Sequence, residues 1–279
     1  MNKKIESMEN VTLNNGVLMP CIGLGVYRVE NKEAEKIVET ALSVGYRHID
    51  TAMYYHNEEA VGKAIKNSGI PRGDKFVTTK MWNADQRSGK VQEAFEASLE
   101  KLGLDYIDLY LIHWPVEGKF VDTWKKFEEI YKSGKVKAIG VSNFLPRHLD
   151  ELLKAATVTP AVNQIELHPY LIQQETLDYC KKAEIQVEAW SQFAANQTGL
   201  FDEQILTDIA KSHSKSPAQV ILRWDYQRGV VTIPKSANKE RMKQNLDIFD
   251  FELTDDEIQK INSLDKNLRV GPNPDKVDF

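Results

Sequence analysis

Apolar residues along the chain follow two alternating patterns. Short runs rich in Val, Ile and aromatic residues predict strands, and the longer segments between them have the apolar period of helices. A hairpin is predicted first, with residues 11–13 and 17–19 joined by a turn at Asn15-Gly16. Eight further strands are then predicted at Ile22–Gly25, Arg47–Asp50, Phe76–Lys80, Ile107–His113, Val136–Ser142, Ala161–Ile165, Gln186–Trp190 and Val230–Pro234.

Several helix ends are marked by their residue types. Glycines that follow a helical segment and precede a strand suit the left-handed residue that ends many helices: Gly45, Gly69, Gly103 and Gly134. Residues 216–219 and 254–257 have the pattern of capping boxes at helix starts. Asn57, with Glu58 and Glu59 after it, predicts another helix start with Asn57 as the cap.

Alternation of strands and helices predicts parallel strands, and eight repeats without a break in composition favour a closed (β/α)8 barrel. An open doubly wound sheet is the alternative. Such a sheet usually has a glycine-rich fingerprint after its first strand, and residues 23–28 have only two of the three glycines. No linker separates the repeats, so residues 1–279 are predicted to form one domain.

Composition narrows the partners and the compartment. A formal net charge of −5 weighs against nucleic acid as a partner, and no apolar run approaches the ~20 residues that span a membrane. The first seven residues lack the apolar core of a signal peptide. Cys21 and Cys180 are far apart and outside any metal-binding spacing, as expected for free thiols in a reducing compartment. We therefore expect a cytoplasmic protein without a metal site, and a monomer.

Three predicted strands end in polar residues, and these carry the candidate chemistry. Asp50, Lys80 and His113 would all lie at the C-terminal mouth of a barrel, where such folds hold their active sites, and Tyr55 follows Asp50 in the next loop. An aspartate and a lysine buried together should form an ion pair. The lysine cation should then lower the pKa of a neighbouring tyrosine from ~10. For each residue alone, a buried ion pair or a core histidine explains the pattern equally well.

Together, these four residues resemble the catalytic tetrad of the aldo-keto reductase family. Their contexts are Arg-His-Ile-Asp-Thr-Ala-Met-Tyr-Tyr-His-Asn-Glu, Thr-Thr-Lys-Met-Trp-Asn and Leu-Ile-His-Trp-Pro, and the likeness runs from about Leu13 to the C-terminus. The resemblance implies a (β/α)8 barrel that reduces carbonyls with NADPH. It makes Tyr55 the proton donor, tuned by Asp50 and Lys80, with His113 orienting the carbonyl.

The resemblance also implies a cofactor site. Ser142, Asn143 and Gln164 match the groups that hold the nicotinamide carboxamide. Trp190 matches the aromatic residue whose ring stacks on the nicotinamide. Lys239 and Lys243 are read as a solvated helix face. The other matches are to residues that contact the rest of the cofactor. Ser191 lies in the loop over the pyrophosphate. The matches to the adenosine 2′-phosphate and adenine contacts are Lys235, Ser236, Asn238, Arg241, Gln244 and Asn245.

Tyr27, Trp82 and Trp114 match substrate-pocket positions, with Phe120 or the last residues of the chain as further candidates. The likeness is strongest to small bacterial members that reduce aldehydes, 2-oxoaldehydes and diketone-like compounds. One position departs from the family: Gln192-Phe193 replaces the usual Pro-Leu after Trp190-Ser191. If proline only lowers the freedom of that loop, Gln192→Pro should tighten NADPH binding modestly.

Two alternatives remain from the sequence. A non-catalytic dinucleotide-binding barrel would share the fold, since a fold does not fix an activity. It would have no need of an acidic tyrosine beside a buried ion pair. A barrel enzyme that uses Lys80 for Schiff-base chemistry is the other alternative, and the adenosine-site run at residues 233–245 weighs against it.

Overall fold

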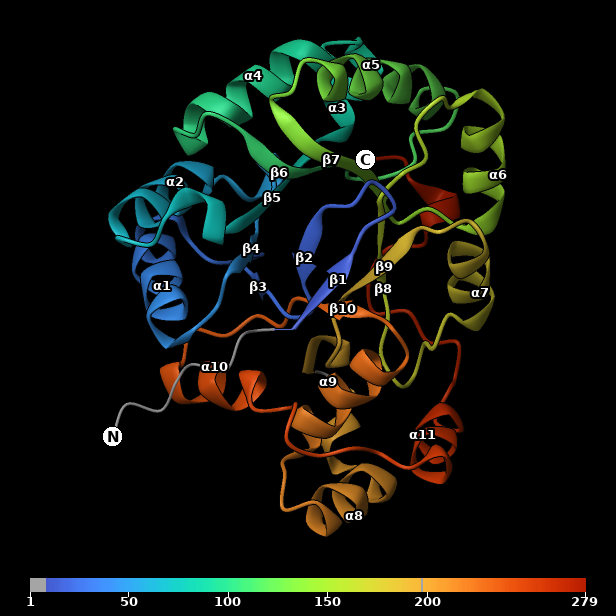
Figure 1. Cartoon of the computed structure of the whole chain (residues 1–279). Coiled ribbons are helices and arrows are strands. Elements are labelled where there is room, and N and C mark those ends of the chain that lie inside the picture. Colours follow the sequence, from blue (N-terminus) through green and yellow to red (C-terminus); the bar gives the residue numbers. More distant parts are fainter. Residues whose placement is uncertain (1–8, 197) are drawn as a thin grey trace.

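The computed structural model describes residues 9–196 and 198–279 of the chain. Its centre is a ring of eight parallel strands surrounded by helices (Figure 1). The expectation that residues 1–7 are not a signal peptide concerns a segment outside the described residues. The ring strands are β3 (Leu24–Gly25), β4 (His48–Asp50), β5 (Phe76–Met81), β6 (Ile107–Ile112), β7 (Val136–Ser142), β8 (Val162–Glu166), β9 (Gln186–Trp190) and β10 (Val231–Thr232).

Neighbouring strands follow chain order from β3 to β10, and the ring is closed between its first and last members. Ile22, just before β3, forms a parallel bridge with Thr232 of β10, and the Gly23 amide donates to the Thr232 carbonyl at 2.7 Å. The (β/α)8 barrel is therefore confirmed, and the open-sheet alternative is excluded. All eight predicted strands occur, although β6 ends one residue before His113 and β10 is shorter than predicted.

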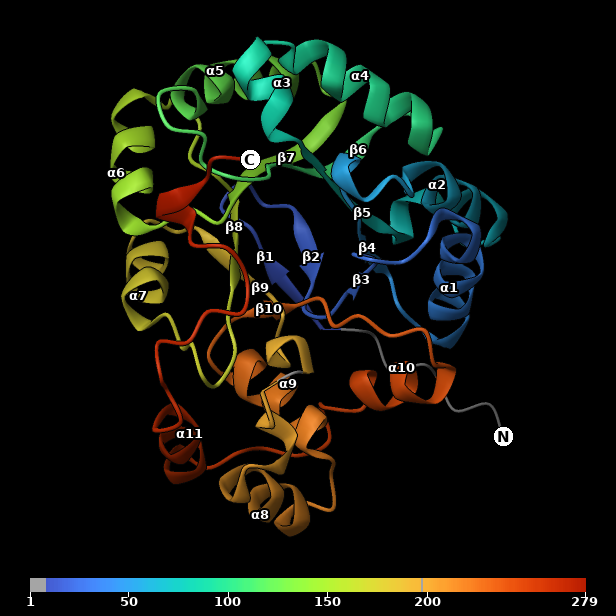
Figure 2. The same cartoon turned by 180° about the vertical axis from the view of Figure 1, so that it is seen from behind.

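Helices follow the strands and cover the outside of the ring (Figures 1 and 2). The first helix, for example, buries an apolar side that contains Ala34, Val38 and Ala41. The helices are α1 (Asn31–Val44), α2 (Glu58–Asn67), α3 (Asn83–Ser88), α4 (Val91–Leu102), α5 (Phe120–Lys132), α6 (Pro146–Ala155), α7 (Gln174–Lys182), α8 (Gln204–Ser212), α9 (Pro217–Gln227), α10 (Lys239–Leu246) and α11 (Asp255–Asn262).

The predicted helix-end signals have mixed outcomes. Gly45, Gly69, Gly103 and Gly134 all have positive φ, and both capping boxes form, at Ser216 before α9 and Thr254 before α11. Asn57 does precede α2, but its side chain does not cap that helix. It is buried and binds the Thr51 hydroxyl and the carbonyls of Val26 and Val29 instead. The prediction of a capping role for Asn57 was therefore wrong, because its side-chain amide donates to carbonyls of the loop that follows β3.

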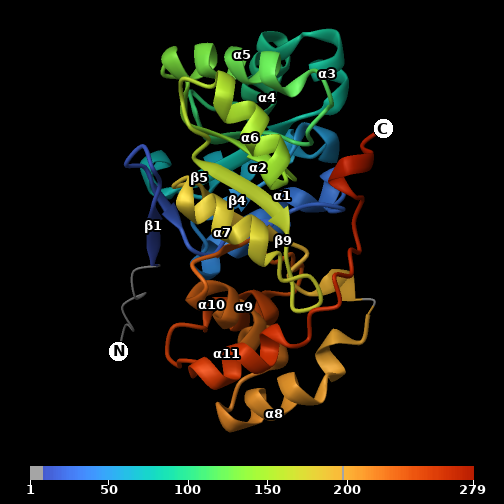
Figure 3. The same cartoon turned by 90° about the vertical axis from the view of Figure 1, so that its right-hand side faces the viewer.

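The two ends of the barrel are closed by different segments. The predicted hairpin forms from β1 (Asn10–Thr12) and β2 (Leu18–Pro20), with Gly16 at φ 84° in its turn. Its Leu13 and Met19 pack inside the ring against Phe76, Leu109 and Leu111. The segment after α11 lies at the opposite end and crosses the mouth formed by the C-terminal strand ends (Figures 2 and 3). The hairpin thus fills the end of the ring opposite to the one where Asp50, Lys80 and His113 were predicted.

Candidate active site

The four predicted catalytic residues meet at this mouth. Asp50 ends β4, Lys80 lies near the end of β5, and His113 directly follows β6. Lys80 Nζ donates to Asp50 Oδ1 at 2.5 Å, to the Thr51 carbonyl at 3.0 Å and to the Tyr55 hydroxyl at 3.4 Å. The Tyr55 and His113 rings lie edge to face, with centroids 5.7 Å apart. The buried ion pair and its tyrosine neighbour are therefore present as predicted.

The ion pair is stable because each charge has a partner. Lys80 is fully buried and Asp50 is 1% exposed. Burial lowers the pKa of Lys80, but the negative charge of Asp50 and the hydrogen bond to it more than offset this, so its pKa is raised above the usual value. Lys80 is consequently a permanent cation at neutral pH. As a charged, unreactive amine it is poorly suited to Schiff-base formation.

The pKa of Tyr55 differs from the expectation. Burial raises it to about 12, and the charge of Asp50 adds to this rise, while Lys80 opposes it. The predicted lowering was therefore wrong for this state of the site, because the cost of burying a phenolate exceeds the benefit of one cation that is already neutralised by Asp50. Tyr55 keeps its proton at neutral pH, which is the form that a proton donor requires.

His113 is neutral and partly free. Burial lowers its pKa well below the usual value, and the charge of Lys80 acts in the same direction. Its Nδ1 has no hydrogen-bond partner among the described residues, and the ring packs edge to face against Trp82 at 5.2 Å. A neutral imidazole with spare bonding capacity can orient a polar ligand without adding a charge.

The residues predicted to hold the nicotinamide form one connected group beside the tetrad. The Ser142 hydroxyl and the Asn143 backbone amide both donate to the Gln164 carbonyl at 2.8 Å. The Trp190 indole donates to Asn143 Oδ1 at 2.8 Å, which fixes the tryptophan ring relative to the amide. Gln164 also donates to Asp50 Oδ2 at 2.8 Å, so a hydrogen bond links this group to the tetrad. A carboxamide could thus meet amide and hydroxyl groups of matching polarity here.

The Trp190 ring is held in place by a segment that the sequence reasoning did not single out. Glu166, at the end of β8, accepts the backbone amides of Val270 at 2.6 Å and Gly271 at 3.2 Å. A Cβ atom on Gly271 would lie 2.3 Å from Cη2 of Trp190. The carboxylate therefore ties the C-terminal segment against the tryptophan, and only a glycine fits at the contact.

Gly271→Ala tests this contact. The added methyl must displace the Trp190 ring or the tail, so we expect a shift in tryptophan fluorescence, weaker NADPH binding and a loss of about 1–3 kcal/mol in folding stability from overpacking. Gly73→Ala is the matched control, because no atom lies within 4 Å of a Cβ there and its φ is not positive. Unchanged fluorescence and binding in Gly271→Ala would show that the tail yields without moving the ring.

The predicted adenosine residues lie where β10 leads into α10. Ser236 is buried, and the Asn238 side chain caps α10 by accepting the Arg241 backbone amide at 3.0 Å. The side chain of Arg241 is exposed and has no ion-pair partner among the described residues. Lys235 binds the carbonyl of Arg28 at 3.0 Å. Of the two predicted adenine contacts, Gln244 is exposed, whereas Asn245 is buried and hydrogen-bonded to Tyr46.

Arg28 is a cationic residue of this region that the sequence reasoning missed. It adopts a left-handed conformation with φ 56°, and its guanidinium lies 5.2 Å from the centre of the Tyr27 ring. Burial lowers the pKa of Lys235, and the charge of Arg28 lowers it further. Arg28 could have been identified from the sequence by its position in the loop that follows the first barrel strand, because that loop lies at the mouth.

The predicted pocket aromatics gather around the tetrad. The ring centres of Tyr27 and Tyr55 are 5.0 Å apart. Trp82 stacks between Tyr54 and Phe279, with ring-centre distances of 4.0 and 5.9 Å. Trp114 contacts both Trp190 and Phe279. Asn83 and Arg87 donate to the Phe279 backbone oxygen at 3.2 and 2.8 Å and hold this ring in place. A compact aromatic wall therefore faces Tyr55 and His113.

Of the two further pocket candidates, Phe279 lies in this wall and Phe120 does not. Phe120 is 1% exposed and packs against Phe144 and His148 in the core beneath α6. The suggestion of Phe120 as a pocket residue was therefore wrong. Its place at the start of α5 turns the side chain toward the helix layer instead of the mouth.

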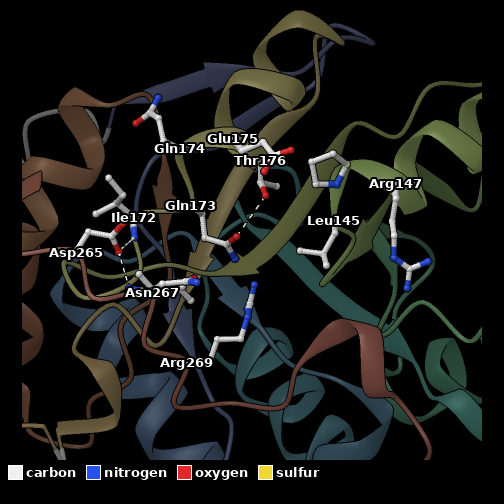
Figure 4. A pocket seen from close by; sticks show the side chains of 12 residues that line it. Leu145, Arg147, Ile172, Gln173, Gln174, Glu175, Thr176, Asp265, Asn267 and Arg269 are labelled. Carbon is white, nitrogen blue, oxygen red and sulfur yellow. Dashed lines mark hydrogen bonds between the residues drawn. The ribbon is translucent and has the colours of Figure 1, made fainter.

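A separate hollow of about 520 Å³ lies between α6, the start of α7 and residues 265–269 (Figure 4). Its lining includes Arg147, Gln173, Thr176 and Arg269, and none of the predicted catalytic or cofactor residues. Both arginines already face carboxylates, Arg147 on Asp275 at 2.6 Å and Arg269 on Glu166 at 3.8 Å. This hollow is thus distinct from the mouth that contains the tetrad.

The loop that departs from the family is strained and internally bonded. Ser191, Ala194, Ala195 and Asn196 all have positive φ, and the Gln192 side chain is buried with its amide donating to the Ala189 carbonyl. A residue before proline is pushed toward extended conformations, whereas Ser191 is left-handed at φ 59°. Proline at 192 would require Ser191 to rearrange, and this cost opposes the tighter NADPH binding that loop entropy alone predicts for Gln192→Pro.

Residues 9–196 and 198–279 contain no group of three or more His, Cys, Asp or Glu side chains arranged to hold a metal ion. No helix in the same part of the chain is long and apolar enough to cross a membrane.

The chain is similar to known proteins over nearly its whole length. The model of the Aldo/keto reductase family matches residues 21–266. The chain is 56% identical to the glyoxal reductase of Bacillus subtilis (strain 168), over 97% of this chain and 98% of that protein. It is 45% identical to a methylglyoxal reductase of Escherichia coli (strain K12), over 95% and 97% of the two chains.

Solved structures give the same answer for the fold. An aldo-keto reductase of Bombyx mori in complex with NADP superimposes with a TM-score of 0.92 at 37% identity, covering 98% of each chain. An aldo-keto reductase from a deep-sea metagenome library superimposes with a TM-score of 0.92 at 47% identity, covering 96% of this chain and 100% of that one. This chain belongs to the aldo/keto reductase family.

Proposed function

We propose that the protein is an NADPH-dependent reductase of small aldehydes and 2-oxoaldehydes, with Tyr55 as the proton donor. The observation that carries the proposal is the Tyr55 hydroxyl, which lies 3.4 Å from a buried Lys80–Asp50 pair and beside a neutral His113. A non-catalytic barrel gains nothing from burying a lysine and an aspartate, because such a pair costs more than an apolar replacement. The arrangement favours catalysis.

Each residue of the tetrad has a separate task. Tyr55 donates its proton to the carbonyl oxygen, and the Lys80 cation stabilises the phenolate that remains. Asp50 keeps Lys80 charged and directed at the hydroxyl. His113 orients the carbonyl oxygen through its free bonding capacity, and its lack of charge leaves the proton of Tyr55 as the one that is transferred.

The residues at the mouth fit a nicotinamide dinucleotide. Asn143, Ser142 and Gln164 offer donors and acceptors to a carboxamide, and Trp190 offers a flat ring that is held by Gly271. Lys235, Ser236 and Arg241 offer cations and a hydroxyl to the phosphate of the adenosine half. When bound, NADPH supplies the hydride that is added to the carbonyl carbon. The relatives solved with NADP or NADPH support this choice of cofactor.

The substrate class rests on the aromatic wall and on the named relatives. Trp82, Trp114 and Phe279 form an apolar wall beside His113, which suits a small carbonyl compound with little polar surface. The two relatives named for glyoxal and methylglyoxal reduction support 2-oxoaldehydes as substrates. A panel of aldehydes, ketones and 2-oxoaldehydes, each followed by NADPH absorbance, tests the proposal. No oxidation of NADPH with any of them would overturn it.

Arg241→Ala should reveal the cofactor preference. The exposed guanidinium has no competing partner among the described residues, so it is available to the 2′-phosphate that NADPH has and NADH lacks. Its removal should weaken NADPH by about 1.5–3 kcal/mol and leave NADH nearly unchanged, as judged by fluorescence titration. Lys239→Ala, an exposed cation on the same helix, is the matched control. Equal losses for both cofactors would make Arg241 a structural residue.

The remaining assignments complete the proposal. The chain acts as a monomer in the cytoplasm, as one domain, without nucleic acid or membrane as a partner. Free and buried Cys21 and Cys180 support a reducing compartment. Sedimentation of the purified protein at assay concentrations checks the monomer, and a dimer would contradict it.

A further inference from the structure

Glu188 lies inside the barrel below the tetrad, and none of the roles above uses it. On β9 it shares the inward face with Trp190, and its side chain is fully buried. Its carboxyl group meets Gln164 of the neighbouring strand β8, whose Nε2 donates to Glu188 Oε2 at 2.5 Å. The same nitrogen donates to Asp50 Oδ2 at 2.8 Å. Two acidic side chains therefore share one amide nitrogen.

This sharing fixes the direction in which the amide points. A primary amide has two N–H donors, and here Asp50 and Glu188 accept both of them. A half-turn of the amide would bring its oxygen against two acidic groups and leave both without a donor, which is costly in a buried site. The Gln164 side-chain oxygen accepts no hydrogen bond from any described residue. It is thus held ready as an acceptor for a ligand.

The second oxygen of Glu188 has no hydrogen-bond partner among the described residues. Glu188 Oε1 lies 3.6 Å from His48 Nε2, and that nitrogen lies 3.1 Å from the Thr78 hydroxyl. Burial raises the pKa of Glu188 to about 8, and the charge of Asp50 adds to the rise. Burial also lowers the pKa of His48 to about 3, helped by the charge of Lys80. At neutral pH Glu188 is protonated and His48 is neutral, so a glutamine at 188 is a close mimic.

We propose that Glu188 is a positioning residue that, together with Asp50, locks the Gln164 amide with its oxygen toward the amino group of the nicotinamide carboxamide. The inference rests on the proposed function, because it requires a nicotinamide beside Gln164. A site held in this way favours cofactors whose carboxamide amino group can donate a hydrogen bond to the Gln164 oxygen. A ring that carries a methyl ketone at that position offers no donor to the Gln164 oxygen.

Binding of two oxidised cofactors tests the lock without relying on turnover. NADP⁺ and its 3-acetylpyridine analogue, which has a methyl group in place of the amino group, are titrated by quenching of tryptophan fluorescence. The parent protein should prefer NADP⁺ by about 3- to 10-fold, the range of one hydrogen bond. Glu188→Met removes one of the two acceptors that hold the amide and should reduce this preference below about 2-fold. Glu188→Gln, which still accepts from Gln164, should retain it.

A control and a second variant keep the outcome interpretable. Glu58→Met removes another buried acidic side chain, one that binds Thr79 away from the mouth, and should leave the preference unchanged. If Glu188→Met does not fold, Glu188→Thr replaces it, since a threonine hydroxyl is too short to reach Gln164. A parent-like preference in the Met or Thr variant, or no preference in the parent, overturns the inference. Failure of NADP⁺ to bind the parent would instead overturn the proposed function.

Discussion

Tyr55→Phe should lower turnover of an aldehyde substrate by about 10²–10⁴-fold, the range attributed to a positioned proton donor. The lost hydroxyl is the group 3.4 Å from Lys80 Nζ, and the ring itself remains to pack against Tyr27 and His113. Cofactor binding should change little, because Tyr55 is not among the groups that match a carboxamide or a phosphate. Steady-state rates and NADPH titrations on the same preparation measure both effects.

Tyr54→Phe is the matched control, since this neighbouring tyrosine is 45% exposed and stacks on Trp82, and within the described part of the chain its hydroxyl makes no hydrogen bond to the ion pair. It should keep near-parent turnover. Activity of Tyr55→Phe above about a tenth of the parent would remove Tyr55 as the acid. His113 would then be the nearest alternative donor, although its lowered pKa makes it a poor one at neutral pH.

Lys80→Met should destabilise the protein by about 3–5 kcal/mol, because it leaves Asp50 buried without its cation. The hydrogen bonds to the Thr51 carbonyl and the Tyr55 hydroxyl are lost with it. Urea unfolding measures the loss. Turnover should also fall by at least about 10²-fold, since no charge then stabilises the Tyr55 phenolate.

The double variant Asp50→Asn with Lys80→Met separates stability from catalysis. Without a carboxylate there is no unpaired charge, and asparagine can still accept from Gln164, so most of the lost stability should return. Turnover should remain as low as in Lys80→Met. If the double variant is as unstable as the single one, then packing of the lysine chain matters more than its charge.

The agreement between pattern and fold has a local cause. Each strand and helix is encoded by its own apolar period, and turn glycines such as Gly45 and Gly103 need no distant partner to adopt positive φ. The eightfold alternation then leaves few arrangements that bury all the strands. For the same reason the sequence placed Asp50, Lys80 and His113 at one end of the barrel, since each lies at or next to the end of a parallel strand.

Other features depend on atoms from distant parts of the chain. The pKa of Tyr55 was misjudged because its rise comes from burial by the assembled mouth, which no local motif reports. Asn57 was read as a helix cap, yet its amide serves the carbonyls of Val26 and Val29. Phe120 has the residue type of a pocket wall, but the direction of α5 buries it in the helix layer.

The sequence by itself thus determined the barrel, its mouth and the identity of the four polar residues there, because period and strand ends are local properties. Only the tertiary structure decided which side chains hold those residues in place. Glu188 reaches Gln164 from another strand, and Gly271 meets Trp190 from a segment some 80 positions away. Such contacts arise from closure of the ring and return of the tail, and a position's own neighbours in sequence contain no record of them.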